Sequence, residues 1–405
     1  MNSAHYLSLE EKYSAHNYHP LPVVLDRGKG VFVWDVEGKK YYDFLSGYSS
    51  INQGHLHPAI LDAFLQQAQK LSLTSRAFHS EVFGEYAQYI TSYFGYDKVL
   101  PMNTGVEAVE TGIKLCRKWA YEKKKIEKDK AVIVVCEGNF HGRTTGVISF
   151  SVDKEATKNF GPFMPGFKII PYNDIAALEN ALQDKNVAGF LVEPIQGEAG
   201  VVVPDEGYLK QAKGLCENAN VLFIADEIQT GLARTGKMLA CDHEDVRPDI
   251  LLLGKALSGG MMPVSAVLAD DEIMMTIGPG QHGSTYGGNP LACKVAIAAL
   301  EVLKNEDLAS KAAELGTLLC TELQKLQSPH ISIVRGKGLL LGIVISHPDK
   351  EAAWNLCVEL KENGLLAKPT HGDKIRFAPP LVITREQIIE CIEIIRDSLA
   401  VLDEK

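Results

Sequence analysis

The chain has 405 residues, of which 46% are hydrophobic, 23% charged and 8% aromatic. This composition is that of an ordinary globular protein, and the length is enough to bury a large core in two domains, or in one large domain with a smaller one attached. The formal net charge of −10 argues against a protein that binds nucleic acid or an anionic membrane through its charge.

Three further features bear on the compartment. No segment has 18 uninterrupted apolar residues, so we expect no membrane-spanning helix. The eight cysteines are scattered without a Cys-x-x-Cys pair, which is typical of reduced, buried thiols rather than of disulfides or a zinc site. The first residues, Met1–Glu11, have neither the apolar core of a secretory signal nor an arginine-rich leader. A cytoplasmic protein is therefore predicted.

In chain order, the first predicted elements are two short strands. They cover residues 30–34 and 40–44 and are joined by a turn at Glu37-Gly38. From about residue 100 to 290, short apolar runs alternate with segments of helical period. Runs that are apolar throughout are buried on both faces, so the alternation predicts an α/β fold with a mostly parallel sheet between helices. The runs are residues 131–136, 187–192, 221–225 and 250–253.

The pattern changes towards the C-terminus. Gly287-Gly-Asn-Pro290 opens a long predicted helix that runs to about Lys304. Beyond about residue 310, a smaller α/β unit is predicted from a strand, a helix, a strand and a last helix, at residues 338–345, 351–363, 374–378 and 385–402. We therefore expect three units: an N-terminal segment (1–45) that packs with the small domain, a large domain (46–290), and a linking helix with the small C-terminal domain (291–405).

Lys255 is the most informative single residue. It lies in Leu251-Leu-Leu-Gly-Lys-Ala-Leu-Ser-Gly-Gly260, directly after an apolar run, where lost hydration lowers the pKa of an amine and makes it a nucleophile toward carbonyls. Asp226 ends the preceding apolar run. A lysine and an acid at neighbouring strand ends fit a pyridoxal phosphate site, where the lysine binds the aldehyde and the acid pairs with the ring nitrogen. On spacing alone, a surface lysine and a helix cap explain the two residues equally well.

Two loops could hold a phosphate and a planar ring. Thr104 begins a capping box at a helix start, whose free N–H groups suit a phosphate, and Gly105 lets the backbone come close to a ligand. In the turn at residues 138–143, Phe140 could stack on a ring and Arg143 could bind a carboxylate. Each stretch is also explained by an ordinary turn or helix cap.

Two acidic residues and an arginine complete the group of candidate site residues. Glu193 and Glu198 lie on a loop after the run at 187–192, where they could move protons or hold a cation. Arg376 lies on a predicted strand between apolar neighbours and needs an internal acid or a substrate carboxylate as its partner. Together these groups suit transfer of an amino group between an amino acid and an oxo acid. The absence of G-x-S-x-G and H-E-x-x-H patterns argues against a serine hydrolase or a metal enzyme.

Long stretches of the sequence resemble the class III pyridoxal phosphate-dependent aminotransferases, and among them most closely the ornithine aminotransferases. The clearest are Leu222-Phe-Ile-Ala-Asp-Glu-Ile-Gln-Thr-Gly231 and Leu253-Gly-Lys-Ala-Leu-Ser-Gly-Gly260. The resemblance implies the fold-type I architecture, pyridoxal 5′-phosphate bound by the large domain, and a homodimer with active sites at the subunit interface. The supporting stretches are residues 15–20, 101–105, 192–200, 282–290 and 376–380.

The resemblance also implies how residues share the work on the cofactor. Lys255 would carry the cofactor and move the proton during transfer, and Asp226 would keep the ring nitrogen protonated. Glu193 would belong to the catalytic group, and Thr285 would reach the phosphate held by the other subunit. The remaining cofactor-binding residues would be Gly105, Val106, Phe140, Ile228 and Gln229.

L-Ornithine and 2-oxoglutarate are the substrates that the resemblance implies. Tyr18 and Arg143 would hold the α-amino and α-carboxylate groups of ornithine, which leaves its distal amine at the cofactor. Tyr48 would shape the same pocket. Glu198 would pair with Arg376 while ornithine is bound and release it for a carboxylate of 2-oxoglutarate. The products would be glutamate 5-semialdehyde, which cyclises to pyrroline-5-carboxylate, and glutamate.

Other functions remain open. The nearest are acetylornithine and γ-aminobutyrate aminotransferases, although γ-aminobutyrate lacks the pair of α groups that Tyr18 and Arg143 would hold. A semialdehyde aminomutase shares Lys255 and Asp226 but needs no external oxo acid. A binding protein without activity has no use for this lysine and acid. His141 stands where some ornithine-specific relatives have tryptophan, so the resemblance does not define that wall of the pocket.

Overall fold

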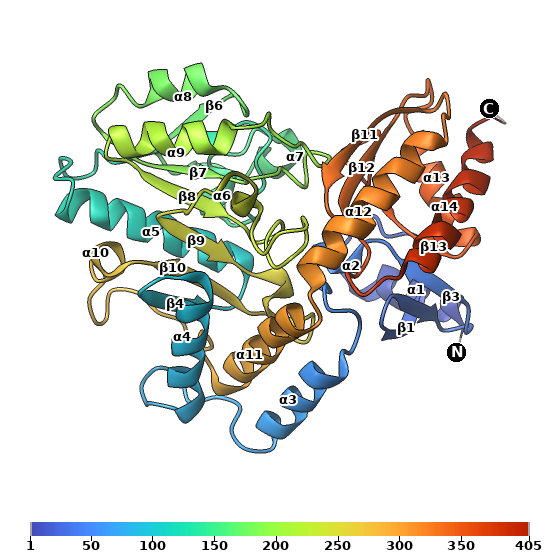
Figure 1. Ribbon diagram of the computed structural model, residues 1–405, viewed down its shortest axis with the longest axis horizontal. Helices are drawn as coiled ribbons and strands as arrows, with labels where there is room; N and C mark the ends of the chain where they lie inside the picture. Colours follow the sequence, from blue (N-terminus) through green and yellow to red (C-terminus); the bar gives the residue numbers. More distant parts are fainter. Residues whose placement is uncertain (1, 404–405) are drawn as a thin grey trace.

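A seven-stranded sheet forms the centre of the larger lobe in the computed structural model, which describes residues 2–403. Its neighbouring strands from β9 to β6 are parallel, whereas β10 runs antiparallel to both β4 and β9 (Figure 1). The predicted α/β fold with a mostly parallel sheet is confirmed. In spatial order the strands are β4 Lys98–Met102, β10 Ser265–Ala269, β9 Ile250–Leu253, β8 Leu222–Asp226, β7 Val187–Val192, β5 Val132–Cys136 and β6 Phe167–Ile170.

Helices cover both faces of this sheet: α5 (Gly105–Glu122) on one, and α8 (Ile175–Ala181) with α9 (Tyr208–Asn218) on the other. Alternate residues of a strand enter the two cores, because side chains alternate across a strand. In β5, Ile133 packs with α5, whereas Val134 packs with α8 and α9. A run that is apolar throughout is therefore what this sheet requires.

A long helix, α11 (Pro290–Asn305), joins the two lobes. Its N-cap is Asn289, whose side chain accepts a hydrogen bond from the Ala292 amide, and Pro290 fills the first turn. The helix packs against α3 (Pro58–Ala68) and α4 (Glu81–Phe94) of the larger lobe. The chain then enters α12, which lies in the smaller lobe (Figure 1).

The smaller lobe, here called the C-terminal lobe, contains a four-stranded antiparallel sheet with the order β11, β12, β15 and β14. Three helices pack against it and share one continuous apolar core with it. Helix α14 begins at the predicted capping box, in which the Thr384 hydroxyl accepts from the Gln387 amide. The elements are α12 Leu308–Lys325, β11 Ile331–Lys337, β12 Leu340–Ile345, α13 Ala352–Glu362, β14 Lys368–Thr370, β15 Lys374–Phe377 and α14 Arg385–Leu399.

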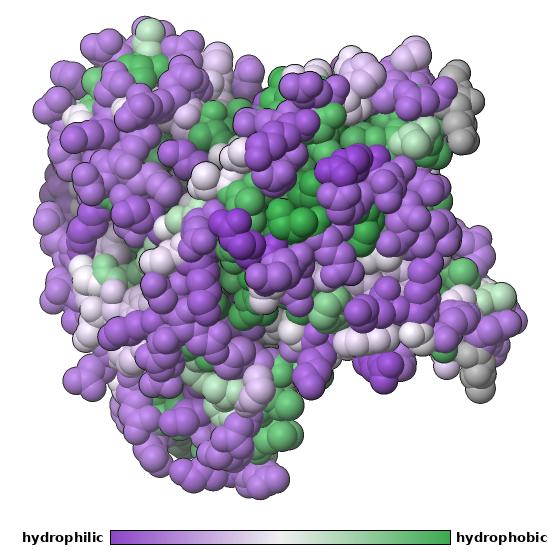
Figure 2. Space-filling view, turned by 45° about the vertical axis from the view of Figure 1, so that its right-hand side comes forward, coloured by the Kyte–Doolittle hydropathy of each residue, from purple (hydrophilic) through white to green (hydrophobic). Residues whose placement is uncertain are grey.

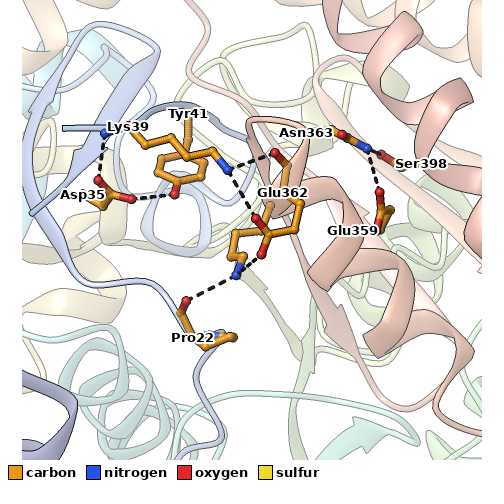
Figure 3. Close-up of polar contacts among 9 residues, drawn as sticks. Pro22, Asp35, Lys39, Tyr41, Glu359, Glu362, Asn363 and Ser398 are labelled. Carbon is orange, nitrogen blue, oxygen red and sulfur yellow. Dashed lines mark hydrogen bonds and ion pairs between the residues drawn. The ribbon is translucent and has the colours of Figure 1, made fainter. Parts of the chain in front are cut away.

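The N-terminal strands form a third sheet with the C-terminal lobe, since β3 pairs in parallel with β13. Figure 3 shows polar contacts that reinforce this junction. The Lys39 ammonium donates to the Glu362 carbonyl oxygen at 2.9 Å, and the Lys361 ammonium donates to the Pro22 carbonyl oxygen at 3.5 Å. These contacts support the proposed packing of residues 1–45 with the small domain. The strands are β1 Leu25–Lys29, β2 Phe32–Asp35, β3 Lys40–Asp43 and β13 Leu365–Leu366.

The remaining elements are short, apart from α1. Figure 2 shows hydrophilic residues over most of one face and a group of hydrophobic residues near its centre. Among residues 2–403, no helix combines the length and the apolar character that crossing a bilayer requires. The remaining elements are α1 Ser3–Tyr13, α2 Ser46–Ser49, α6 Thr145–Ile148, α7 Lys154–Thr157, α10 Asp271–Met274, and the 3-10 turns η1 Ala240–Glu244, η2 Lys255–Ser258 and η3 Ala400–Leu402.

Candidate active site

A cavity of about 330 Å³ opens at the carboxyl ends of the parallel strands. Loops that follow β5, β7, β8 and β9 line it together with the start of α5, which is where ligands bind in open α/β sheets. Most of the residues predicted from the sequence meet here. Those that line the cavity are Gly105, Val106, Phe140, Arg143, Glu193, Glu198, Asp226, Ile228, Gln229 and Lys255.

Lys255 occupies the turn η2 directly after β9, with a left-handed backbone φ of 44°. Burial lowers the pKa of its amine to about 8 because the ammonium form loses hydration. The carboxylates of Glu198 and Asp226 oppose this shift, whereas the positive charge of Arg376 adds to it. A substantial fraction of the amine is therefore unprotonated near neutral pH and can act as a nucleophile or a base.

Asp226 ends β8 inside the protein, with only 4% of its surface exposed. One of its oxygens accepts from the Ile228 amide at 3.1 Å, and the other lies 2.6 Å from Nδ1 of His141. Burial on its own would lower the pKa of His141, but the hydrogen bond to Asp226 and its charge raise it overall. The second ring nitrogen of His141, Nε2, is buried without a partner among residues 2–403.

Glu193 follows β7 and accepts a hydrogen bond from the Phe140 amide at 2.8 Å. Burial, with a further contribution from the charge of Asp226, raises the pKa of Glu193 to about 8, although His141 opposes the shift. The carboxyl group is thus mostly protonated at neutral pH. It can hold a proton near Asp226 without adding a further negative charge to a cavity that already contains Asp226 and Glu198.

Glu198, Gln229 and Arg376 form one hydrogen-bonded group. The Arg376 Nη1 donates to Glu198 at 2.6 Å and to Gln229 at 3.1 Å, and the Gln229 amide donates to Glu198 at 2.9 Å. Burial would raise the pKa of Glu198, but the charges of Arg376 and Lys255 lower it to about 2. The Nε of Arg376 has no partner in the described part of the chain, so this side chain retains capacity for a further acceptor.

Tyr48 lies beside this group, with its ring centroid 5.3 Å from the Arg376 guanidinium. Burial and the charge of Glu198 raise the pKa of its hydroxyl. Tyr18 is 71% exposed, and its ring lies 5.9 Å from the Lys368 ammonium of β14. Neither tyrosine lines the cavity that contains Lys255. Arg143 does line it and stacks over Phe140, with 5.3 Å between the guanidinium and the ring.

The start of α5 has the predicted capping box. The Thr104 hydroxyl accepts from the Glu107 amide, and the Glu107 carboxylate accepts from the Thr104 amide. Gly105 must remain small, because a Cβ on it would come within 3.0 Å of Ile228. Gly105 and Val106 line the cavity, so this helix start is placed where a phosphate seat requires it.

Thr285 is not part of this cavity. It lies on an exposed loop before α11, next to Tyr286, which is 58% exposed. Its predicted contact with a phosphate thus depends on a second copy of the chain and stays a prediction.

The comparisons with known proteins agree with this geometry. The model of the family "Aminotransferase class-III" matches residues 13–399. The chain belongs to this family. The predicted resemblance, the fold-type I architecture and the pyridoxal phosphate-dependent aminotransferase class are confirmed.

Relatives named ornithine aminotransferase match over nearly the full chain. The rat protein is 62% identical over 98% of this chain and 91% of its own, and the Drosophila melanogaster protein is 63% identical over 96% and 90%. Among solved structures, the Toxoplasma gondii ornithine aminotransferase has a TM-score of 0.98 and 49% identity, covering 100% of this chain and 95% of its own. An Elizabethkingia anophelis structure named acetylornithine aminotransferase has a TM-score of 0.91 and 61% identity, covering 99% of each chain.

The cofactor of this class III aminotransferase is pyridoxal 5′-phosphate, and one Toxoplasma gondii structure has it at partial occupancy in the active site. The residues of this chain fit the group. Asp226 offers a buried carboxylate for the ring nitrogen, Lys255 an amine for the aldehyde, and the glycine-containing start of α5 a seat for the phosphate. The Nε2 of His141, which has no partner among the described residues, supplies a further polar group at the cavity wall.

The predicted cytoplasmic location is wrong. Ornithine aminotransferases of rat and of two Drosophila species, 62–63% identical to this chain, are named mitochondrial proteins. Targeting segments are recognised separately from the folded enzyme, so the composition of the folded chain does not determine its compartment.

His141 has a role that the sequence reasoning did not assign. Its hydrogen bond to Asp226 joins the loop after β5 to the end of β8, although β7 lies between these strands. The available signal is a histidine directly beside Phe140 in the turn at residues 138–143, after a predicted strand. His141 and Asp226 are far apart in the sequence, and only the strand order brings them together. The contact is therefore not evident from the sequence.

Proposed function

We propose that this chain transfers the δ-amino group of L-ornithine to 2-oxoglutarate, giving glutamate 5-semialdehyde and glutamate. The observation that carries the proposal is the group of Glu198, Gln229 and Arg376 beside Lys255. An arginine that is covered by a carboxylate but keeps a free Nε can serve a cationic donor and a dianionic acceptor in turn. The identity of 54–63% to ornithine aminotransferases supports the same substrates.

Bound pyridoxal phosphate supplies an aldehyde that takes up the amino group and a ring that delocalises the electrons left on the substrate carbon. Asp226 holds the ring nitrogen protonated, and His141 orients this carboxylate. Lys255 attaches the cofactor, and its amine then moves the proton, which a pKa of about 8 suits. Glu193, mostly protonated at neutral pH, completes the catalytic group.

The other cofactor contacts that we propose come from residues that line the cavity. Phe140, Ile228 and Gln229 line the cavity and would contact the bound cofactor, with Phe140 able to stack on the ring and Gln229 able to reach its phenolic oxygen. The backbone amides of Gly105 and Val106 at the start of α5 hold the phosphate.

We further propose a homodimer in which Thr285 of a second copy completes the phosphate site. What supports this is the position of Thr285 on an exposed loop outside its own cavity. Exposed aromatic side chains in the same part of the fold, Phe78 at 73% and Tyr286 at 58%, offer apolar area for a subunit contact.

The donor site combines two lobes. Arg143 of the larger lobe binds the α-carboxylate of ornithine, Tyr18 of the N-terminal segment binds its α-amino group, and Tyr48 forms the pocket wall. Glu198 covers Arg376 while the donor is bound. When 2-oxoglutarate enters, Arg376 releases Glu198 and takes the carboxylate with its guanidinium fork.

The second candidate is an acetylornithine aminotransferase, because a structure with that name is 61% identical to this chain. Acetylation removes the positive charge of the α-amino group and adds bulk to it, so acetylornithine does not offer the group that we assign to Tyr18. The substrate itself therefore discriminates the two functions.

A half-reaction panel tests the proposal. The purified pyridoxal form is mixed with ornithine, acetylornithine or γ-aminobutyrate, and the loss of cofactor absorbance is followed. We expect ornithine to react fastest, and turnover to require 2-oxoglutarate, unlike a mutase. A faster reaction with acetylornithine would overturn the substrate assignment. Borohydride reduction and peptide mapping should place the cofactor on Lys255, with the Lys255→Ala variant as the control.

A further inference from the structure

Arg234 is one of the largest side chains with no exposed surface in the described chain. It lies in the loop that follows Asp226 and Gln229, before η1. Its guanidinium donates from Nε and Nη2 to the Asn52 side-chain oxygen, at 3.1 and 2.5 Å. Its Nη1 donates to the carbonyl oxygens of Leu339 at 2.9 Å and of Pro379 at 2.6 Å.

A buried guanidinium without a carboxylate in contact destabilises a core, because the lost hydration of the charge is not offset by an opposite charge. Among residues 2–403, every hydrogen-bond partner of Arg234 is an uncharged oxygen. Burial lowers the pKa of Arg234 to about 9, with Asp43 opposing the shift, so the side chain is still charged at neutral pH. Apolar side chains would fill this volume at a lower free-energy cost. This points to a role for Arg234 in positioning other segments rather than in packing.

The three segments that Arg234 joins come from different parts of the fold. Asn52 follows α2, which carries Tyr48. Leu339 forms the turn between β11 and β12, and Pro379 lies just beyond Arg376 on the chain leaving β15.

The contact with the β11–β12 turn is tight on the backbone as well. The Leu339 amide donates to the Arg234 carbonyl oxygen at 3.1 Å, and a Cβ on Gly338 would lie 2.3 Å from the Thr235 carbonyl carbon. The loop of Arg234 and the C-terminal lobe therefore meet without a side chain between them. Small displacements at this point would be passed through β12 to β15, which pairs with it.

We propose that Arg234 is a positioning residue for acceptor binding: it fixes the Arg376-bearing strand of the C-terminal lobe against Glu198 and Gln229 of the larger lobe. This inference rests on the proposed function of Arg376. Arg234 itself touches neither the cavity nor the reacting atoms. It acts through the carbonyl oxygens that it holds.

Arg234→Lys is the informative variant. Lysine keeps the charge, but its single nitrogen cannot reach Asn52, Leu339 and Pro379 from the spread positions of a guanidinium. We expect the dissociation constant of 2-oxoglutarate in its half-reaction to rise about tenfold, as a misplacement below 1 Å can produce, with the ornithine constant changing less than about threefold. Arg117→Lys, which removes a guanidinium contact to the Pro165 carbonyl on the far side of α5, is the matched control and should change neither constant.

A second readout needs no substrate. The amides of Ala378 and Leu381 donate to the carbonyl oxygens of Phe44 and Asn52, both at 2.8 Å. Hydrogen exchange of peptides covering residues 376–382 should be faster in Arg234→Lys than in wild type and unchanged in Arg117→Lys. If Arg234→Lys does not fold, Asn52→Ala, which removes the acceptor of Nε and Nη2, should give the same changes at smaller amplitude.

The outcomes separate the two proposals. Equal losses in both half-reactions, or unchanged exchange at residues 376–382 in a folded variant, would mean that Arg234 only stabilises the core. A wild-type enzyme that fails to react with 2-oxoglutarate would instead remove the proposed function, whatever the exchange data show.

Discussion

At the residue scale, the cavity keeps ionisable groups in different protonation states within one small volume. The pKa of Glu198 is lowered to about 2 by Arg376 and Lys255 against the effect of burial, whereas burial raises that of Glu193 to about 8. One carboxyl group is therefore charged and the other mostly neutral at pH 7. Two acids with pKa values pushed apart are a recurring arrangement in enzymes that move protons.

The charge of Glu198 should determine which amine of ornithine reacts. In Glu198→Ala, Arg376 loses its cover and is free to bind the α-carboxylate, so we expect ornithine to enter with its α-amine at the cofactor. NMR spectroscopy, which distinguishes these isomeric products, then finds the α-oxo acid of ornithine beside, or instead of, pyrroline-5-carboxylate. Glu198→Asp, which keeps a carboxylate, is the control. Unchanged products in Glu198→Ala would contradict the covering role.

Glu193 should make stability depend on pH. Because its folded pKa is raised, the folded state binds a proton that the unfolded state releases, and the free energy of unfolding falls as the pH rises from about 4.5 to about 8. Glu193→Gln removes this proton from both states. Urea unfolding at several pH values should therefore show a shallower decline for Glu193→Gln across this window than for wild type. Parallel curves would show that Glu193 keeps an ordinary pKa.

At the element scale, α2 is a left-handed turn. Ser46, Gly47, Tyr48 and Ser49 have φ values of 50°, 55°, 59° and 70°, although only one of them is glycine. Left-handed backbone costs a residue with a Cβ roughly 1–2 kcal/mol. Strain of this kind persists where the surroundings fix it, and here it directs Tyr48 toward Arg376.

Gly47→Ala tests this strain. A Cβ at this position would meet nothing closer than 3.6 Å, so the substitution acts through φ alone and should lower the free energy of unfolding by roughly 1 kcal/mol. Gly84→Ala in α4, where a Cβ meets nothing within 4 Å and φ is helical, should raise it by a similar amount. Denaturant titration of both variants gives the comparison. Equal effects in the two variants would mean that α2 is not strained.

The strands that were predictable from the sequence are those buried on both faces. Val187–Val192 and Ile250–Leu253 have no polar residue to suggest another structure. The antiparallel direction of β10 was not predictable, because its five buried residues have the same pattern as a parallel strand. β13 has two residues and exists only through its pairing with β3, which no local pattern encodes.

The candidate site was predictable where motif-bearing loops follow strands. Lys255, Asp226 and Glu193 reach one cavity because parallel strands end at the same edge of the sheet. The contacts of Arg234 were not predictable, because each of its partners comes from a segment remote in sequence.

At the scale of the whole molecule, the N-terminal sheet is held to the C-terminal lobe by a few polar contacts as well as by strand pairing. The Tyr42 hydroxyl donates to the Glu390 carboxylate of α14 at 2.6 Å. The neighbouring Tyr41 hydroxyl makes a similar bond to Asp35, at 2.6 Å, but within its own sheet. The two tyrosines thus make comparable contacts: that of Tyr42 joins the N-terminal sheet to the C-terminal lobe, and that of Tyr41 stays within the N-terminal sheet.

Removing these hydroxyls should distinguish a contact that attaches the N-terminal sheet to the C-terminal lobe from a contact that only stabilises the N-terminal sheet. Tyr42→Phe and Tyr41→Phe should each lower the free energy of unfolding by about 1 kcal/mol, because each loses a hydrogen bond to a carboxylate. Only Tyr42→Phe should also increase limited proteolysis between residues 14 and 24, where the N-terminal segment approaches the C-terminal lobe. Equal protease sensitivity of the two variants would contradict an attachment through the Tyr42–Glu390 contact; Figure 3 shows the Tyr41–Asp35 contact used as the control.

The parallel pairing of β3 with β13 has a kinetic consequence. Tyr18 and Arg376, which we assign to donor and acceptor, lie in parts of the chain that this pairing joins, whereas Lys255 belongs to the larger lobe. Because Glu198 covers Arg376 while the donor is bound and must release it for the acceptor, the two substrates occupy the enzyme alternately. We infer that the first product departs before the second reactant arrives, the order known as ping-pong exchange.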